Sequence, residues 1–317
     1  MAKPLEYNAT LTERVDITDA LTLFRVTPDQ PPAQRPWFTP GQYCVLGLNN
    51  MEKPELGSVR RSMSIASAPE DDGPTEFYIR WVAKPESDNP LTHLLWKLKT
   101  GDRMYMRAVA AGVFTVKDTV GADDPRIRVM VAAGTGSAPF LCMVRSELRR
   151  NPSADLSKWV LLHGASYPAD LGYRDELQRL VEVNKLKYWG TVSRPKEAPD
   201  WRGDSGRVEA FFDASGSGSR LDDLEKRLGL PPGGFTPKNV VIYICGLTGT
   251  ITGTIVPLID RGFVPDFKRI REALGVPADI KDSVFYEQYD TEPVINIKDE
   301  AVVAPLRVRM QAALARS

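Results

Sequence analysis

The stretch I-R-V-M-V-A-A-G-T-G-S-A-P-F, residues 127–140, decides the fold of the second half of the chain. Its apolar beginning predicts a buried strand, and the F-L-C-M-V-R-S-E-L-R-R that continues from its end predicts a helix. Gly134 and Gly136 let a ligand approach the backbone closely, and Pro139 suits the first turn of a helix. The free N–H groups of such a helix can bind a pyrophosphate, but a tight strand–helix turn in any α/β protein has the same pattern.

Three further apolar runs have the same character and lie at 159–165, 187–193 and 240–246. Helical patterns such as R-D-E-L-Q-R-L-V-E-V, residues 174–183, separate them. Apolar strands that alternate with helices indicate a parallel α/β sheet, which binds ligands at the carboxyl ends of its strands. The loop-rich residues 213–239, with one short helical piece, form an excursion within this domain.

The first 120 residues follow a different pattern, in which short strands are broken by Gly- and Pro-rich turns. Strands are predicted at 21–26, 42–48, 62–67, 76–82 and 103–109. One helical pattern interrupts them at 89–98, and the series indicates a β-barrel or sandwich. We therefore predict an N-terminal antiparallel β-barrel domain over residues 1–122, a parallel α/β domain over 123–290 and a C-terminal extension over 291–317.

Composition narrows the class of protein. The 317 residues contain 41 basic and 41 acidic side chains, so net charge gives no reason to expect a nucleic-acid partner. Cys44, Cys142 and Cys245 form no CxxC motif, and with only two histidines we expect no metal site. The N-terminus lacks an apolar signal region and no run approaches the ~20 apolar residues of a membrane span, so we expect a cytoplasmic protein without a membrane partner.

The stretch R-R-S-M-S-I-A-S-A-P, residues 60–69, places two arginines directly before small hydroxyl residues. Arginine presents rigid donors for phosphate oxygens, and serine hydroxyls can donate to ring nitrogens or carbonyls. A ligand with both a phosphate and a heterocycle would fit this pattern. An edge strand with solvated arginines and a Ser-rich turn is the alternative.

Other polar side chains follow the predicted strands of the second half. I-C-G-L-T-G, residues 244–249, is a second glycine turn, and its Cys245 is either a small buried apolar residue or a functional thiol without a nearby histidine. T-V-S-R and S-G-R-V place Arg194 and Arg207 after two further strand ends. The two arginines could clamp a phosphate monoester or could be ordinary surface charges.

Taken in order, these motifs resemble the ferredoxin–NADP reductase family, specifically its compact bacterial ferredoxin/flavodoxin reductases. R-S-M-S resembles the family's R-x-Y-S flavin motif, and A-A-G-T-G-S-A-P-F resembles its nicotinamide-nucleotide turn. The resemblance implies an enzyme with FAD and NADP that exchanges electrons between NADPH and ferredoxin or flavodoxin, by hydride transfer at flavin N5. The alternatives are an NADH-dependent reductase of an oxygenase system, a free flavin reductase or, in a different class, a non-catalytic flavin or nucleotide sensor.

The resemblance also implies roles for individual residues. Arg61 would bind the FAD pyrophosphate, Met63 would lie against the flavin ring, and Ser64 would hydrogen-bond near N5. The FAD set comprises Arg61, Ser62, Met63, Ser64, Ile79, Arg80, Trp81, Leu91 and Thr92. The nucleotide set comprises Gly134, Thr135, Gly136, Pro139, Ser166, Arg194, Arg207 and Gly246, with both arginines on the 2′-phosphate and Thr135 where flavin meets nicotinamide. Ser64, Cys245 and Tyr289 are the candidate catalytic residues.

Three positions depart from the family pattern. Met63 replaces the usual tyrosine, and Ser166 stands where related reductases often place a third phosphate-binding arginine. Family members commonly end near an aromatic residue that covers the flavin, whereas 27 residues follow Asp290 here. Tyr289 aligns best as the cover, with Tyr286 as its rival, and the tail, which looks helical and basic, could gate turnover.

The resemblance implies a separate electron carrier, because the chain has no iron–sulfur ligands of its own. Six basic residues could form a face for an acidic ferredoxin or flavodoxin: Arg35, Arg60, Lys97, Lys99, Arg103 and Arg107. Encounters of this kind are small and salt-sensitive. We expect the enzyme to be a monomer.

Overall fold

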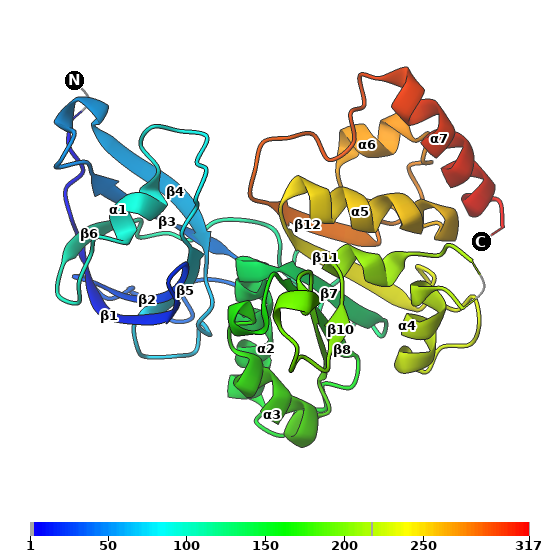
Figure 1. Ribbon diagram of the computed structural model, residues 1–317, viewed down its shortest axis with the longest axis horizontal. Helices are drawn as coiled ribbons and strands as arrows, with labels where there is room; N and C mark the ends of the chain where they lie inside the picture. The colour runs from blue at the N-terminus through cyan, green and yellow to red at the C-terminus, as the bar shows by residue number, and fades with distance from the viewer. Residues whose placement is uncertain (1–2, 217, 317) are drawn as a thin grey trace. The chain divides into compact units, whose positions relative to one another are not determined.

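The computed structural model describes residues 3–216 and 218–316. The chain divides into two compact units, the first formed by Met1–Asp123 with Ser137–Ala154 and the second by Asp124–Gly136 with Asp155–Ser317. Each unit has its own sheet of six strands (Figure 1). No helix in the described residues has the length and apolarity needed to cross a bilayer.

The first unit is an antiparallel β-barrel, as predicted. Its strands have the order β4-β3-β6-β1-β2-β5 and are β1 (Ala9–Thr18), β2 (Leu21–Pro28), β3 (Tyr43–Asn49), β4 (Ser58–Ser64), β5 (Thr75–Arg80) and β6 (Arg103–Met106). A bridge between Ile65 and Phe77 joins the chain after β4 to β5 and closes the sheet. The Ala66 N–H, which donates to Glu76 O at 2.8 Å, supports the closure.

Two helices belong to the first unit. The segment predicted as a helix over 89–98 forms only α1 (Leu91–Leu95), because Pro90 is extended and the chain after Leu95 continues as turns. The longer α2 (Ala138–Arg150) packs against the barrel: Arg145 Nη1 donates to Glu76 Oε1 at 2.7 Å and to Ala66 O at 2.9 Å. This contact fixes α2 to the point where the barrel closes.

The second unit contains the predicted parallel sheet, with the strand order β10-β9-β8-β7-β11-β12. The strands are β7 (Ile127–Ala133), β8 (Trp159–Ala165), β9 (Lys187–Val192), β10 (Asp204–Ser205), β11 (Val240–Gly246) and β12 (Val284–Gln288). The chain builds outward from β7 to β10 and then returns to place β11 on the other side of β7. In an open α/β sheet, the carboxyl ends of two such central strands form the usual ligand site.

Five helices of the second unit lie within the described residues. They are α3 (Arg174–Asn184), α4 (Arg220–Leu228), α5 (Thr248–Leu258), α6 (Lys268–Ala273) and α7 (Glu300–Leu314). The short helix of the predicted excursion is α4, which starts with a capping box between Ser219 and Asp222 and ends at Gly229 in the left-handed region. Both devices satisfy backbone groups that a helix end otherwise leaves without partners.

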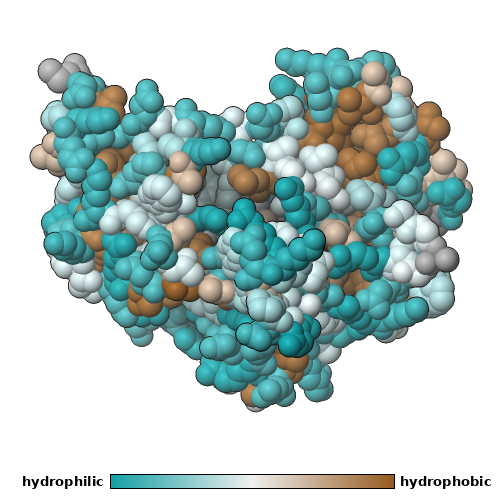
Figure 2. All heavy atoms as spheres, viewed as in Figure 1, coloured by the Kyte–Doolittle hydropathy of each residue, from teal (hydrophilic) through white to brown (hydrophobic). Residues whose placement is uncertain are grey.

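The residues after β12 also fold as helix. α7 lies next to α5 and α6 (Figure 1), and its Val303 and Met310 are buried in the same core as the sheet. Arg309 pairs with Asp260 at 2.8 Å and anchors the outer side of the helix. Figure 2 shows hydrophobic residues at the surface in the region of α6 and α7. The tail is therefore helical, as predicted, and it contributes core residues to the second unit.

Candidate functional site

The arginine–serine stretch lies on β4, which pairs with β3 so that Arg61 lies opposite Leu46 and Ser64 opposite Tyr43. Arg61 and Ser62 are exposed, Met63 is half-buried and Ser64 is buried. Arg61 forms no salt bridge with any described residue; its Nη1 donates only to the backbone oxygen of Arg60 at 2.9 Å. Its guanidinium therefore remains available to an anionic ligand.

The remaining predicted flavin residues lie at the end of β5 and on α1. Ile79 is buried, Arg80 is exposed, and Trp81 stacks on His93 with ring centroids 5.0 Å apart and an interplanar angle of 15°. This stack was missed from the sequence, where Trp81 was given only a backbone role. The Nε2 atom of His93 is 2.8 Å from Val82 O, which fixes the imidazole under the indole.

The Thr92 hydroxyl tests whether this region fits a polar ligand. Its Oγ1 is buried and has no hydrogen-bond partner in the described part of the chain, while the neighbouring Leu91 is packed into the barrel core. A buried hydroxyl without a partner costs about 1–3 kcal/mol. Such a group is expected where a ligand atom completes the hydrogen bond. The residues present therefore fit the predicted cofactor.

The glycine turn after β7 has the predicted course, but the reason for glycine at position 136 differs from the prediction. Gly134 has φ of 56°, and residues Gly134–Ser137 form a short 3-10 helix that leads into α2, with Pro139 in its first turn. A Cβ on Gly136 would lie 2.1 Å from Cys245 O. Gly136 is therefore required by the close approach of β11, whereas we had expected it to admit a ligand.

His163 supports this turn from below. It lies on β8, is fully buried, and its Nε2–H donates to Gly134 O at 3.0 Å, while its Nδ1 faces the hydroxyl of Tyr188 at 3.5 Å. Burial lowers the pKa of His163 to about 4, so the imidazole is neutral at physiological pH. The sequence alone does not indicate this role, because the contact joins residues that are 29 positions apart.

The second glycine turn, after β11, leads into α5 and is occupied by a carboxylate. Leu247 provides no side-chain cap for α5; instead, the N–H of Thr248 donates to Asp290 Oδ2 at 3.0 Å. The first turn of α2 contains no acidic residue. The positive end of α5 is thus already neutralised, and the turn at Gly134 is the one that remains suited to a pyrophosphate.

Cys245 and Tyr289 meet beside these turns. The Cys245 thiol is 3.2 Å from the Tyr289 hydroxyl, which in turn donates to Thr135 O at 3.4 Å. Burial raises the pKa of Cys245 well above its ordinary value, and the nearby Glu287 carboxylate raises it further, so the thiol stays protonated. Cys245 can therefore donate a hydrogen bond but is not an activated nucleophile.

Glu287 was also missed from the sequence. Its Oε2 lies 3.8 Å from Cys245 Sγ because β12 pairs in parallel with β11 in a register that places Cys245 opposite Glu287. The Y-E-Q-Y-D segment contained this carboxylate, but the register between two parallel strands cannot be read from either strand alone. The site thus gains an acidic group that the sequence reading did not include.

The two tyrosines that compete as the aromatic cover occupy different environments. Tyr289 is 43% exposed and its N–H donates to Gly246 O at 3.0 Å. Tyr286 is half-buried against the core of the second unit, and burial together with Asp266 raises its pKa to about 12. The Tyr289 hydroxyl contacts Cys245 and Thr135, whereas Tyr286 packs against the core, so the environment favours Tyr289 over Tyr286.

The predicted phosphate-binding residues follow three neighbouring strands. Ser166 follows β8, Arg194 follows β9 and Arg207 follows β10, and the Arg194 N–H donates to Ser166 O at 3.2 Å. Arg194 Nη1 also donates to the Tyr167 hydroxyl at 2.6 Å and its guanidinium lies over that ring at 5.3 Å. The side chain of Arg207 is 77% exposed and lies 3.9 Å from Glu209. Tyr167 is an addition that the sequence reading did not make.

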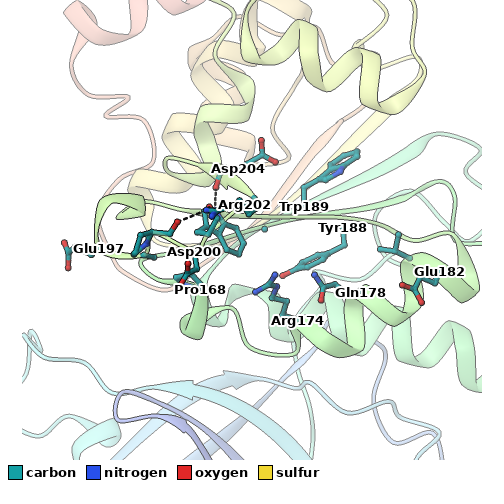
Figure 3. A pocket seen from close by; sticks show the side chains of 16 residues that line it. Pro168, Arg174, Gln178, Glu182, Tyr188, Trp189, Glu197, Asp200, Arg202 and Asp204 are labelled. Carbon is teal, nitrogen blue, oxygen red and sulfur yellow. Dashed lines mark hydrogen bonds between the residues drawn. The ribbon is translucent and has the colours of Figure 1, made fainter.

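A cavity of the second unit lies away from the predicted site residues. It has a volume of about 1080 Å³ and is lined by residues of α3, β9 and the loop before β10; Figure 3 shows Arg174 and Tyr188 pointing toward each other within it. None of the predicted site residues lines it. One chain of hydrogen bonds connects the cavity to the Gly134 turn: the hydroxyl of Tyr188 contacts His163, and His163 donates to Gly134 O.

The predicted basic face of the first unit is partly neutralised. Arg35 lies 3.6 Å from Asp72, Lys97 pairs with Glu52, and Arg103 pairs with Asp29. The remaining three residues of that set form no salt bridge with described residues: Arg60, Lys99 and Arg107. The positive charge available on this face is therefore smaller than the sequence predicted. The carboxylates that pair with these residues come from distant segments of the chain.

Comparison with known proteins connects these features to a family. An oxidoreductase NAD-binding domain matches residues 130–254. Ferredoxin–NADP reductase B of Sorangium cellulosum is 33% identical over 236 residues, which cover 74% of this chain and 80% of that protein. A flavodoxin/ferredoxin–NADP reductase of Shigella flexneri is 31% identical over 214 residues, covering 66% and 74% of the two chains.

The fold agrees with this result. A ferredoxin NADP+ reductase from Neisseria gonorrhoeae, solved with bound FAD and NADP, superimposes with a TM-score of 0.64 at 22% sequence identity and covers 89% of this chain and 96% of that one. The antiparallel barrel and the parallel α/β sheet of this chain therefore match the fold of that reductase. This chain therefore belongs to the ferredoxin–NADP reductase family of flavin-dependent oxidoreductases.

Proposed function

We propose that this protein uses FAD to exchange electrons between NADPH and a one-electron protein carrier, ferredoxin or flavodoxin. The observation that supports NADP most directly is the row of polar groups after β8, β9 and β10, where Arg194, Arg207 and Tyr167 lie at the same sheet edge as the Gly134–Ser137 turn. Two arginines at adjacent strand ends match a doubly charged 2′-phosphate. The names of the relatives support the choice of carrier.

Bound FAD would supply the redox chemistry, taking up a hydride and releasing electrons singly. In the first unit, Arg61 would neutralise the pyrophosphate, the Thr92 hydroxyl would gain its missing partner, and Met63 would provide an apolar face. Met63 in place of an aromatic side chain gives a softer, more adaptable contact to the flavin ring. Ser64, buried at the end of β4, is the proposed hydrogen-bonding group near N5.

In the second unit, the turn at Gly134–Ser137 would hold the nucleotide pyrophosphate. Cys245 would present a neutral thiol toward the nicotinamide, and Glu287 and Tyr289 would orient that thiol. A protonated thiol excludes covalent thiolate chemistry at physiological pH, which agrees with a positioning role. Ser166 offers no positive charge, so Arg194 and Arg207 would provide the phosphate selectivity.

Thr92→Val tests the flavin part of this proposal, because valine keeps the shape and removes the hydroxyl. The flavin-free protein should be equally stable or up to about 1 kcal/mol more stable, since a buried unsatisfied group disappears. FAD should bind about five- to tenfold more weakly. Thermal unfolding without flavin and titration with FAD measure the two effects. Destabilised apoprotein with unchanged FAD affinity would contradict the assignment of Thr92.

Carrier reduction tests the partner. The flavin-loaded protein should reduce a bacterial ferredoxin or flavodoxin with NADPH, at a rate that falls as ionic strength rises. Because three of the six basic residues are already paired, we expect a modest salt dependence. Rapid flavin reduction with no transfer to either carrier would favour a free flavin reductase, and bound flavin that NADPH never reduces would favour a sensor.

A further inference from the structure

Tyr289 is held from the residue that follows it. The carboxylate of Asp290 accepts hydrogen bonds from Thr248 N at 3.0 Å, from Thr248 Oγ1, and from Gln288 Nε2 at 2.7 Å. Gln288 Nε2 also donates to Thr248 Oγ1 at 2.7 Å. Asp290 therefore joins the end of β12 to the start of α5. Its partner Gln288 directly precedes Tyr289 in the sequence, and Asp290 directly follows it.

The chain beyond Asp290 strengthens this attachment. Thr248 Oγ1 donates to Glu292 O at 3.1 Å, and Thr252 Oγ1 donates to Val294 O at 2.6 Å. Val294 and Ile295 are buried in the core of the second unit. Tyr289 is therefore held on its C-terminal side, because residues 290–295 are hydrogen-bonded along α5.

Charge makes Asp290 the principal attachment in this segment. The carboxylate occupies the N-terminal end of α5, an eleven-residue helix without a side-chain cap from Leu247. Burial would raise the pKa of Asp290, but the hydrogen bonds from Thr248 and Gln288 outweigh it and lower the pKa below its usual value. The group is thus ionised, and a negative charge at a helix N-terminus is stabilising.

Tyr289 meets the nucleotide residues from this fixed position. Its N–H donates to Gly246 O at 3.0 Å, and its hydroxyl lies between Cys245 Sγ and Thr135 O. Under the proposed function, these residues frame the nicotinamide. The tyrosine ring and the nicotinamide ring would therefore compete for the same neighbours.

We propose that Asp290 is a positioning residue that latches Tyr289 against Cys245 and Thr135, so that the nicotinamide ring is admitted only when this latch opens. The proposal rests on the proposed function. It adds that Asp290 sets the equilibrium between a closed site, in which Tyr289 contacts Cys245 and Thr135, and an open site that can bind the nicotinamide ring. A closed state that competes with the ligand lowers apparent affinity by the fraction of molecules that are open. Loosening the latch should raise that fraction.

The test compares two ligands in Asp290→Ala. NADP+ contains the nicotinamide, whereas 2′,5′-ADP contains only the adenosine and phosphate part. NADP+ should bind about fivefold more tightly to the variant, the factor expected from losing one capping carboxylate, and 2′,5′-ADP should bind unchanged. Titration calorimetry of the flavin-loaded protein gives both dissociation constants. Tyr289→Ser should have the same effect on the NADP+ value, and combining it with Asp290→Ala should add little.

Asp299→Ala is the matched control, because Asp299 also caps a helix of the second unit: its Oδ1 accepts from Ala301 N at 3.0 Å at the start of α7. This variant should lose a similar amount of thermal stability without changing the ratio of the two dissociation constants. Asp290→Glu, which keeps the charge, should retain part of the wild-type ratio.

Each outcome decides between the proposals. An unchanged ratio in Asp290→Ala, or equal weakening of both ligands, would overturn the latch while leaving the proposed function intact. A ratio that shifts equally in Asp299→Ala would show a general stability effect and would also overturn it. Wild-type protein that binds neither NADP+ nor 2′,5′-ADP would overturn the proposed function and the latch together.

Discussion

The two glycine turns of the second unit have similar sequences and different fates. After β7, the turn at Gly134–Ser137 carries no acidic residue and leads into α2, whose first turn also contains no acidic residue. After β11, the turn at Gly246 leads into a helix whose first N–H is taken by Asp290. Because one turn is left open and the other is filled by the chain itself, only the first is suited to an anionic ligand. The function of a strand–helix turn thus depends on what later segments place upon it.

The largest expected effect is a difference in unfolding free energy between alanine substitutions in the two turns, because only one turn is tightly packed. Gly136→Ala places a methyl group 2.1 Å from Cys245 O, whereas Gly249→Ala in the first turn of α5 meets no atom within 4 Å. We expect Gly136→Ala to lose about 3 kcal/mol of unfolding free energy, and Gly249→Ala to be neutral or to gain up to about 1 kcal/mol. Urea unfolding of the two variants measures the difference. Similar stabilities would show that the open turn does not pack tightly on β11.

The next effect concerns the histidine beneath the open turn. The pKa of His163 falls from 6.5 to about 4 on folding, so the unfolded chain binds more protons between these values. The resulting contribution to stability is full above pH 6.5 and is lost as pH falls toward 4. Between pH 7.5 and 5, this group should cost about 2 kcal/mol of unfolding free energy.

His163→Gln provides the comparison, because it keeps a donor for Gly134 O and removes the titration. The difference in unfolding free energy between wild type and variant should shrink by that amount as pH falls from 7.5 to 5. Carboxylates titrate in both proteins and cancel in this difference. A difference that does not change with pH would mean that His163 is not buried as a neutral group.

A smaller effect comes from giving the open turn the charge that the closed turn already has. Thr135→Asp places a carboxylate in the Gly134–Ser137 turn, where it should repel the nucleotide pyrophosphate. We expect NADP+, which contains this pyrophosphate, to bind about tenfold more weakly, equivalent to about 1–2 kcal/mol. Thr135→Asn, of similar shape without the charge, should bind within about twofold of wild type. Equal behaviour of the two variants would remove the electrostatic distinction between the turns.

Features set by local sequence were predictable. The β7–α2 turn, the position of Pro139 and the separation into a barrel and a parallel sheet follow from periodicity and from Gly and Pro, which act over a few residues. The positions of Arg194 and Arg207 at the carboxyl edge follow from the alternation of strands and helices.

Contacts between distant segments were not predictable in the same way. The Cys245–Glu287 contact depends on the register of β11 and β12, and the Asp290–Thr248 contact depends on where the chain returns after β12. His163 and Gly134, whose contact supports the turn, are 29 residues apart in sequence. A shift of one residue in the register of β12 would move Glu287 to the other face of the sheet, so sequence patterns could not assign its contact with Cys245.

We expect the open turn and the two strand-end arginines to select NADPH over NADH. Anaerobic rapid mixing of the flavin-loaded protein with each nucleotide, followed at the flavin absorbance band, measures this selectivity. Bleaching should be fast with NADPH and slow with NADH, and Arg194→Ala should lose most of this preference. Equal rates with both nucleotides, or a faster reaction with NADH, would contradict it and would point to an NADH-dependent reductase in which Ser166 leaves the phosphate site incomplete.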